Sequence, residues 1–389
     1  MTYLVQDGQK RTIYCINIRF ASSFWVMIDQ FTAPADVRPM VDELLSEALH
    51  SRASDLHVEP EADAYELRLR IDGVLQAMQR VDQTTGRAMV GRLMVMARLL
   101  TYRMDIPQEG RISLPLENLE LRLSVMPTIH GMRAAVRMPA DRVQRAVLED
   151  LGLPPAVMRG LESFAATDCG MLILTGPAGS GKTTTMYALL RRIIQINPGL
   201  SLIALEDPVE RDLPGVTQIE VSPFGQLTYE KALRSILRQD PQVLMLGEIR
   251  DAATASLAVQ AALSGHRLIT ALHAATAGGA LARLLEMGIE PYQLTSSIFG
   301  IVAQRLIRKK SSDGNGYTGR IPLAEFVVMD EPLKKAVLQR SDSDAMRKIY
   351  QGQAGYQSLC DVGRSLVDGE ITDGAELGRV IDVTRPIQS

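Results

Sequence analysis

The chain has 389 residues, of which 46% are hydrophobic and 22% charged, a globular composition whose length predicts two or three domains. A net charge of -3 indicates no general affinity for nucleic acid. Cys15, Cys169 and Cys360 form neither a metal motif nor a disulfide framework, which fits a reducing compartment. Without a signal peptide or an apolar run of ~18 residues, the chain is expected to be cytoplasmic and to reach a membrane only through partners.

The N-terminal third combines helical and strand-like patterns. Residues 1–34 alternate weakly and suggest one or two strands, forming a short N-terminal extension. The elements expected next are two helices and several strands, over Val37–Arg52, Tyr65–Ile71, Gly86–Leu100 and 111–138. We therefore expect residues 35–140 to form a small α+β domain.

A turn-rich boundary at Leu151–Pro155 precedes a different pattern. Beyond it, continuous apolar runs alternate with helical patterns, as a parallel sheet buried on both faces requires. The runs are Met171–Thr175, Ser201–Leu205, Val243–Leu246 and Leu268–Leu272. We therefore expect residues 141–389 to form an α/β domain, whose last part, from about 310 to 389, folds mostly as short helices.

The strongest motif follows the first apolar run and precedes a helical pattern. It matches G-x-x-x-x-G-K-[ST] over Gly176, Pro177, Ala178, Gly179, Ser180, Gly181, Lys182 and Thr183, with Thr184 next. Glycines let backbone N–H groups wrap a phosphate chain, and the helix presents its positive end to the same anion. Lys182 is expected to reach the β- and γ-phosphates, and the Thr183 hydroxyl to ligate Mg²⁺. The alternative is a glycine-rich turn that contains a lysine by chance, but it does not explain why the motif lies between an apolar run and a helical pattern. The motif therefore predicts binding of ATP and Mg²⁺.

Two other apolar runs end in carboxylates. Glu248 follows the run that ends at Leu246, where it can polarise an attacking water. Glu206 and Asp207 follow the run that ends at Leu205, where they can orient water or hold Mg²⁺ through water. A solvated strand end or a helix cap explains the same residues structurally, so their role stays open at this point.

Histidines and arginines outside the phosphate loop are further candidates. His266 and His273 flank the run Leu268–Leu272, and a neutral histidine can sense the γ-phosphate by hydrogen bonding. Arg122 and Arg137, in the first domain, can complete an ATP site as fingers. Satisfied structural histidines and solvated arginines are the ordinary alternatives.

Together, these motifs resemble those of the type II secretion and type IV pilus assembly ATPases, from about residue 36 to the C-terminus. The matching segments are Ser54–Pro60, Arg70–Gly73, Gln108–Ser113, Gly176–Thr185, Glu206–Glu210, Leu237–Asp251, Ser264–His273, Ala303–Leu306 and Gly319–Arg320. In this family a glycine before the glutamate, as at Glu248, is normal. The resemblance therefore favours functional roles for Glu248, His266 and His273.

The resemblance implies a PAS-like first domain, a RecA-like P-loop motor domain and a ring of six identical subunits. It implies that Arg122 and Arg137 approach the nucleotide phosphates. Closure between the domains is then expected to move an inner-membrane platform protein, at the cytoplasmic face of that membrane and without nucleic acid. The reaction expected is ATP + H₂O to ADP + phosphate, with Glu248 activating water, supported by Glu206 and Asp207.

Three departures from the family pattern qualify these expectations. Lys309–Thr318 occupy the place of a tetracysteine element, so no zinc site is expected. Residues 1–34 are too short for the usual recruitment domain. Ala274–Ala275 follow the second histidine, and Gln242 replaces an acidic residue, changes that can lower turnover.

Three alternative functions remain open from the sequence. One is a pilus retraction ATPase, although the segment Gln218–Arg238 looks more like that of assembly members. Another is a nucleic-acid translocase, since RecA-like motors also pull DNA. The third is a catalytically weak nucleotide-gated scaffold, which Ala274–Ala275 keep open.

Overall fold

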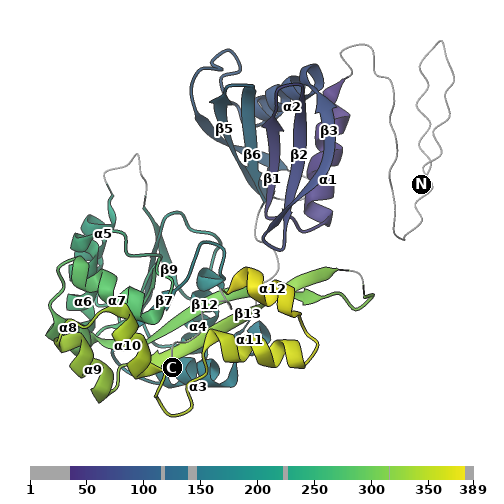
Figure 1. Cartoon of the computed structure of the whole chain (residues 1–389). Coiled ribbons are helices and arrows are strands. Elements are labelled where there is room, and N and C mark those ends of the chain that lie inside the picture. The colour runs from purple at the N-terminus through teal and green to yellow at the C-terminus, as the bar shows by residue number, and fades with distance from the viewer. Residues whose placement is uncertain (1–35, 115–118, 139–146, 222–226, 315, 382–389) are drawn as a thin grey trace, which may run out of the picture.

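The computed structural model describes residues 36–114, 119–138, 147–221, 227–314 and 316–381. Its strands form two separate sheets, one of six strands and one of seven (Figure 1). The expected α/β fold class with a smaller α+β domain in front is confirmed. The strands expected in residues 1–34 lie outside the described residues.

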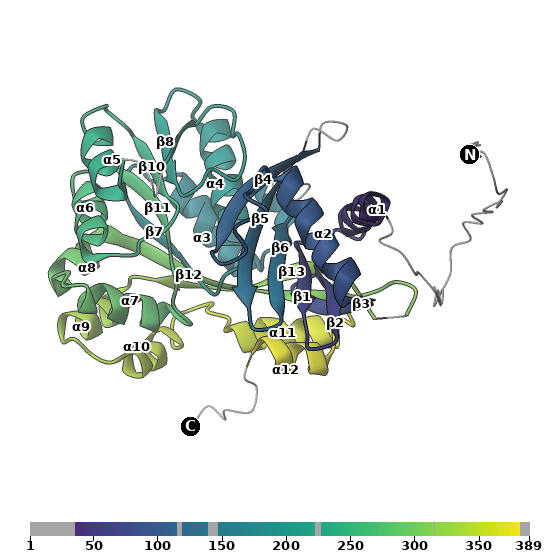
Figure 2. The same cartoon turned by 90° about the horizontal axis from the view of Figure 1, so that it is seen from above.

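The N-terminal domain is an antiparallel sheet, in the order β3-β2-β1-β6-β5-β4, with two helices along one face (Figure 2). Its elements are α1 (Val37–His50), β1 (Asp55–Pro60), β2 (Ala64–Ile71), β3 (Val74–Asp82), α2 (Gln83–Met96), β4 (Gln108–Leu114), β5 (Leu119–Thr128) and β6 (Gly131–Arg137). In β2, Tyr65, Leu67 and Leu69 are buried and alternate with polar residues. This period of two leaves the other face of the sheet polar.

The second sheet has the order β13-β12-β7-β11-β10-β8-β9, and all its strands are parallel except β13. Its elements are η2 (Leu148–Leu151), α3 (Pro155–Ala165), β7 (Gly170–Thr175), α4 (Lys182–Ile196), β8 (Leu202–Glu206), β9 (Thr217–Glu220), α5 (Tyr229–Ile236), β10 (Val243–Leu246), α6 (Ala252–Leu263), β11 (Arg267–Leu272), α7 (Ala277–Glu286), α8 (Pro291–Ser297), β12 (Ile298–Lys310), β13 (Tyr317–Val328), α9 (Glu331–Leu338), α10 (Ser343–Tyr350), α11 (Leu359–Asp368) and α12 (Gly374–Val380).

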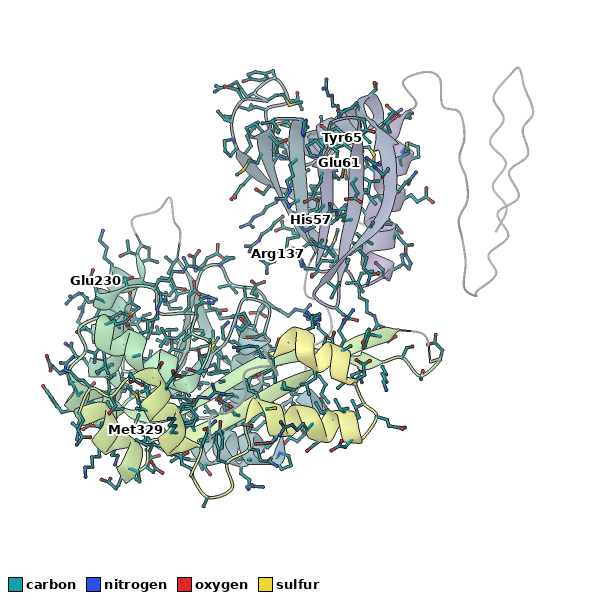
Figure 3. The ribbon with its side chains drawn as sticks, viewed as in Figure 1. His57, Glu61, Tyr65, Arg137, Glu230 and Met329 are labelled. Atoms are coloured by element: carbon teal, nitrogen blue, oxygen red, sulfur yellow. The ribbon has the colours of Figure 1, made fainter. Side chains whose placement is uncertain are left out.

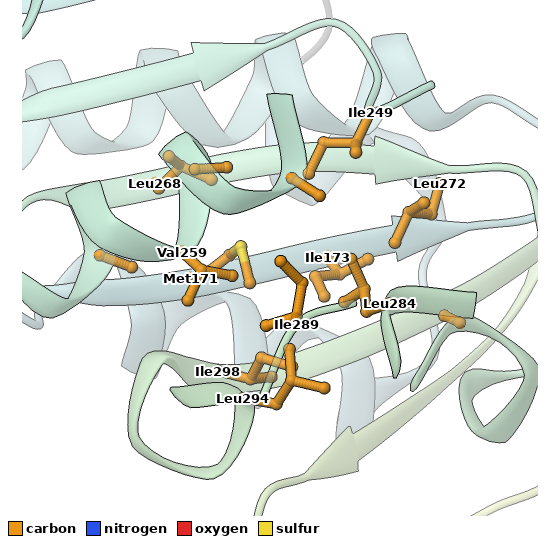
Figure 4. Packing of buried hydrophobic residues seen from close by; sticks show 14 of the residues in the cluster. Met171, Ile173, Ile249, Val259, Leu268, Leu272, Leu284, Ile289, Leu294 and Ile298 are labelled. Carbon is orange, nitrogen blue, oxygen red and sulfur yellow. The ribbon is translucent and has the colours of Figure 1, made fainter. Parts of the chain in front are cut away.

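Apolar clusters cover both faces of the central strands. On one face, Met171 and Ile173 of β7 pack with Leu268 of β11 and Val259 of α6 (Figure 4). On the other face, alternate residues of the same strands pack against α3 and α4. Burial on both faces explains why these strands are continuous apolar runs in the sequence.

The expectation that residues from about 310 onward fold mostly as helices is wrong for 317–328. These residues form β13, which pairs antiparallel with β12 from Gly300–Val328 to Arg308–Arg320. Leu323, Ala324 and Val327 of β13 are buried, so core packing holds the segment as a strand. The helical part begins at α9.

The two domains touch at the turn between β2 and β3. The backbone N–H of Gly319 donates a 2.8 Å hydrogen bond to Asp72 Oδ2, and Arg320 Nε lies 3.7 Å from Asp72 Oδ1.

None of the helices in the described part of the chain is long and apolar enough to cross a membrane.

Candidate active site

The parallel strands of the second sheet bring the predicted strand-end residues to one edge. Thr175 of β7 lies beside Leu272 of β11, while Leu246 of β10 pairs with Thr270 of β11 and Leu205 of β8. The residues that follow these strand ends therefore share the carboxyl edge of the sheet, where open α/β sheets bind ligands.

The loop from Gly176 to Thr183, called the P-loop here, joins β7 to α4 at this edge. Gly176, Gly179 and Gly181 have φ values of 152°, 71° and 88°, a backbone region that other residues rarely adopt. A Cβ on Gly176 would lie 2.3 Å from the Gln304 carbonyl oxygen. The helix α4 begins at Lys182 without a side-chain cap, so its first N–H groups are free to bind an anion.

The polar groups of the P-loop fit a phosphate chain. Lys182 Nζ donates hydrogen bonds of 2.8 and 2.9 Å to the carbonyl oxygens of Gly176 and Pro177, and burial lowers the pKa of this lysine. Ser180 Oγ is buried and has no hydrogen-bond partner among the described residues. Thr183 and Thr184 lie half-buried in the first turn of α4, where the Thr183 hydroxyl fits the predicted Mg²⁺.

Two residues of β12, to which the sequence motifs gave no role, hold the loops at this edge: Gln304 supports the P-loop, and Arg305 binds the loop that follows His273. Gln304, which is 2% exposed, accepts a 2.9 Å hydrogen bond from Thr185 Oγ1 and donates one of 2.9 Å to the Ser180 carbonyl. Arg305 donates to the Ala275 carbonyl at 2.6 Å, and burial lowers its pKa. Both residues lie in Ala303–Leu306, a segment that matches the family pattern, and this match is the feature of the sequence that could have identified them.

Glu248 lies at the centre of a charged cluster. Its Oε2 is 2.7 Å from His273 Nε2, and Arg250 donates to its Oε1. Arg250 also donates a 3.0 Å hydrogen bond to Asp207 Oδ2. Burial acts to raise the pKa of Glu248, but Arg250 and then His273 outweigh it, so the pKa is lowered and the carboxylate stays ionised. His273 thus contacts Glu248 directly, while Arg250, a residue not predicted as part of the site, joins Glu248 to Asp207.

Glu206 is turned away from this cluster. It is 3% exposed, and its two oxygens accept hydrogen bonds from Tyr187 Oη at 2.5 Å and Gln218 Nε2 at 2.9 Å. Burial raises the pKa of Glu206. The carboxyl group therefore ties α4 and β9 to the end of β8, beneath Asp207.

The two predicted histidines lie at opposite ends of β11. His273 follows the strand and contacts Glu248, whereas His266 precedes it and its Nδ1 lies 2.9 Å from the Ala261 carbonyl. A strand of six residues spans ~20 Å, so His266 is remote from the P-loop edge. The structure corrects the prediction that His266 belongs to the catalytic group of this chain, because strand direction separates the two histidines.

Arg122 and Arg137 face each other across the β5–β6 pair, and both are exposed. Arg111 of β4 is the neighbour of Arg122 on its other side. Figure 3 shows Arg137 at the end of the N-terminal domain that faces the second domain. Within the described ranges, no hydrogen bond or ion pair joins Arg122 or Arg137 to the P-loop. Those ranges also contain no cluster of three or more histidine, cysteine, aspartate or glutamate residues suited to a metal ion.

Comparison with known proteins places this site in a family. A family model described as type II/IV secretion system protein matches residues 31–379. The type II secretion system protein HxcR of Pseudomonas aeruginosa is 37% identical over 372 residues, covering 90% of this chain and 78% of the relative. The type II secretion system ATPase E of Vibrio cholerae is 34% identical, covering 89% of this chain and 75% of the relative. The type IV pilus assembly ATPase PilB of Thermus thermophilus is 32% identical, but only 40% of its length is covered.

Solved structures show the same fold. The Legionella pneumophila ATPase DotB matches with a TM-score of 0.68 at 21% identity, covering 91% of this chain and 97% of that chain. The pilus retraction motor PilT, solved with bound ADP, matches with a TM-score of 0.62 at 24% identity, covering 87% and 95%. At this identity the likeness concerns the fold alone.

Proposed function

The chain belongs to the type II/IV secretion system protein family, and we propose that it is the ATP-hydrolysing motor that drives pilus or pseudopilus assembly in a secretion or pilus machine. The observation that carries the proposal is the uncapped P-loop beside a carboxylate, Glu248, that is ionised and held at the same sheet edge. A nucleotide-binding loop alone binds phosphate, whereas a positioned carboxylate beside it can also activate water.

In the proposed reaction, water attacks the γ-phosphate in line and ADP leaves. Lys182 leaves its loop carbonyls to bind the phosphates, together with the N–H groups at the start of α4. Glu248 orients the water and accepts its proton, while His273 and Asp207 fix the cluster through direct and Arg250-mediated contacts. Bound Mg²⁺, held by Thr183, would withdraw charge from the phosphate oxygens. Glu206 acts as a positioning residue beneath Asp207.

Arg122 and Arg137 are proposed to offset charge on the phosphoryl oxygens when the N-terminal domain closes. Arg111, Arg122 and Arg137 stand on neighbouring strands, and like charges directly opposite destabilise a sheet. Arg111 forms an ion pair with Glu120 at 3.3 Å. Asp55 of β1 lies opposite Arg137 in register, but its Oδ2 is 3.4 Å from Arg70 Nε, and no carboxylate among the described residues forms an ion pair with Arg122 or Arg137. An anion such as a nucleotide phosphate would relieve this repulsion.

We propose further that the working form is a homo-hexamer at the cytoplasmic face of the inner membrane, where it moves a platform protein. Relatives named as type II secretion proteins and a pilus assembly ATPase support assembly over retraction. A retraction motor is the second candidate, favoured only by the fold-level likeness to PilT.

Glu248→Gln tests the reaction. The amide keeps the shape of the side chain but cannot accept a proton, so ATP binding should persist while hydrolysis slows by ~10² or more. Binding is measured by titration with a fluorescent ATP analogue and hydrolysis by phosphate release. Glu286→Gln, an exposed change at the end of α7, should leave both unchanged. Loss of nucleotide binding in Glu248→Gln would make Glu248 a structural residue and remove the proposed base.

A further inference from the structure

The N-terminal domain has an open pocket at the end of its sheet opposite Arg137. Its volume is about 280 Å³, and its wall includes Tyr65, Arg87, Val90, Met104, Thr128 and Met132. The strand β6 starts at Gly131 in this pocket and ends at Arg137, so the two places lie ~20 Å apart. Tyr65 and Arg137 are seen at opposite ends of the domain in Figure 3.

The floor of the pocket carries a buried hydroxyl. Tyr65 is 0% exposed, and its Oη lies near the Arg87 side chain and the Met132 backbone N–H, which can only donate, so no group in the described part of the chain accepts the hydroxyl proton. The ring fits only because Gly86 and Gly131 lack side chains: a Cβ on Gly86 would lie 2.2 Å from the ring, and one on Gly131 2.5 Å from Oη. Burial raises the pKa of Tyr65, so the hydroxyl remains a donor. A buried donor without an acceptor is unfavourable, which suits a guest that accepts its proton.

The pocket also has one charge without a carboxylate partner. Arg87 is exposed on the second turn of α2, and no carboxylate among the described residues forms an ion pair with it. In the neighbouring loop, Arg103 and Asp105 form an ion pair at 2.9 Å, so their charges cancel. His130, in the turn between β5 and β6, is the nearest titratable group in sequence to the pocket's Thr128 and Gly131. A cation, a hydroxyl donor and apolar walls together fit a carboxylate on an apolar stem.

The rim of the pocket is apolar and exposed. Ile129, in the turn between the pocket residues Thr128 and Gly131, is 93% exposed, and Met104 in the wall is 43% exposed. A free organic acid in a pocket of this size would leave these side chains in water. A polypeptide covers such a rim while it inserts one side chain, which is the usual form of an interface anchor.

We propose that this pocket docks a peptide segment of a partner protein, and that the segment carries an aspartate or glutamate flanked by apolar residues. The carboxylate accepts hydrogen bonds from Tyr65 and Arg87, and the flanking residues cover Ile129 and Met104. Docking then occurs at the end of the N-terminal domain that lies farthest from Arg122 and Arg137. The proposal does not rest on ATP hydrolysis.

A random-peptide phage library selected on the full chain tests this proposal. Enriched peptides should carry an acidic residue between apolar ones, and replacing that residue by its amide should weaken binding ~10-fold or more. Tyr65→Phe keeps the ring and removes only the hydroxyl, and Arg87→Gln removes only the charge. Each should weaken binding ~5-fold or more, whereas Arg38→Gln, the same charge change on exposed α1, should not.

Three results would overturn the proposal. The first is enrichment of peptides without a carboxylate, or a peptide affinity that is the same in Tyr65→Phe and Arg87→Gln as in the parent. The second is competition by free hexanoate as strong as by the peptide, which would assign the pocket to a small organic acid. The third is a changed oligomeric state of Tyr65→Phe or Arg87→Gln in light scattering, which would assign the surface to a second copy of the chain. Melting temperature and ATP turnover of both variants should match the parent, showing that the fold is retained.

Discussion

Gln304 shows how a residue outside the motif determines the shape of the P-loop. Its side chain joins Thr185 on α4 to the Ser180 carbonyl, and both bonds are buried. Gln304→Ala removes two hydrogen bonds worth ~1 kcal/mol each and leaves the Thr185 hydroxyl unpaired. We therefore expect affinity for a fluorescent ADP analogue to fall ~10-fold. Gln339→Ala, on the exposed end of α9, is the control; equal affinities of the two variants would show that β12 does not support the loop.

The residues that could be predicted in the site are those fixed by strand direction. Carboxyl ends of parallel strands meet at one edge, so Asp207 and Glu248 were expected together. The same reasoning applied to Leu268–Leu272 separates His266 from His273, because a six-residue strand has its ends far apart. Arg250 could not be predicted as the link, since its contacts depend on side-chain geometry across two strand ends.

At the scale of elements, α12 is attached to β12 by one buried carboxylate. Glu376, whose side chain is 0% exposed, bonds Arg308 at 2.7 Å and Arg379 at 2.6 Å. Burial alone would raise the pKa of Glu376, but Arg379 and Arg308 lower it from 4.5 to about 2. The lowered pKa means that this contribution to the free energy of unfolding is full above about pH 4.5 and is lost as the pH falls toward 2.

Glu376→Gln should therefore lower the free energy of unfolding at pH 7 by about 3 kcal/mol, because two arginines lose their anion. The gap from the parent should narrow as the pH falls from 5 toward 2, because the unfolded chain protonates Glu376 below about pH 4.5 while the folded chain keeps this carboxylate ionised until about pH 2. Urea unfolding at several pH values measures this. The exposed pair of Glu331 and Lys334 provides the control, since Glu331→Gln should change little. A gap that stays constant with pH would rule out the ionised carboxylate as the cause.

Strands β7, β8, β10 and β11 in the middle of the sheet were predictable, whereas β12 and the edge strands β9 and β13 were not. Runs such as Val243–Leu246 are apolar throughout because both faces are covered. In contrast, β13 mixes exposed and buried residues and contains Pro322, so its sequence lacks a clear period. The pairing of Arg122 with Arg137 could be predicted from the sequence, because a hairpin turn around Ile129 and His130 places those two residues opposite each other.

At the scale of the whole molecule, the role proposed for Arg122 and Arg137 would make hydrolysis depend on domain closure. Arg122 and Arg137 reach a phosphate only if the N-terminal domain approaches the P-loop. Arg122→Ala and Arg137→Ala should each cut turnover ~10-fold or more with little change in ATP affinity, because fingers act on the transition state. Steady-state kinetics and nucleotide titration separate these effects, with Arg38→Ala as control. Normal turnover in the double variant would leave an ATPase without the inter-domain coupling.

Hydrolysis of ATP at the P-loop is the activity on which the proposed function depends, and it is measured as phosphate release by the purified full chain with Mg²⁺ and ATP. The comparison is with Lys182→Ala, which removes the phosphate-binding ammonium but keeps the backbone of α4. We expect steady turnover by the parent, with activity per chain rising as protein concentration favours rings, and none above background by the folded variant. Phosphate release by Lys182→Ala within twofold of the parent would contradict this expectation.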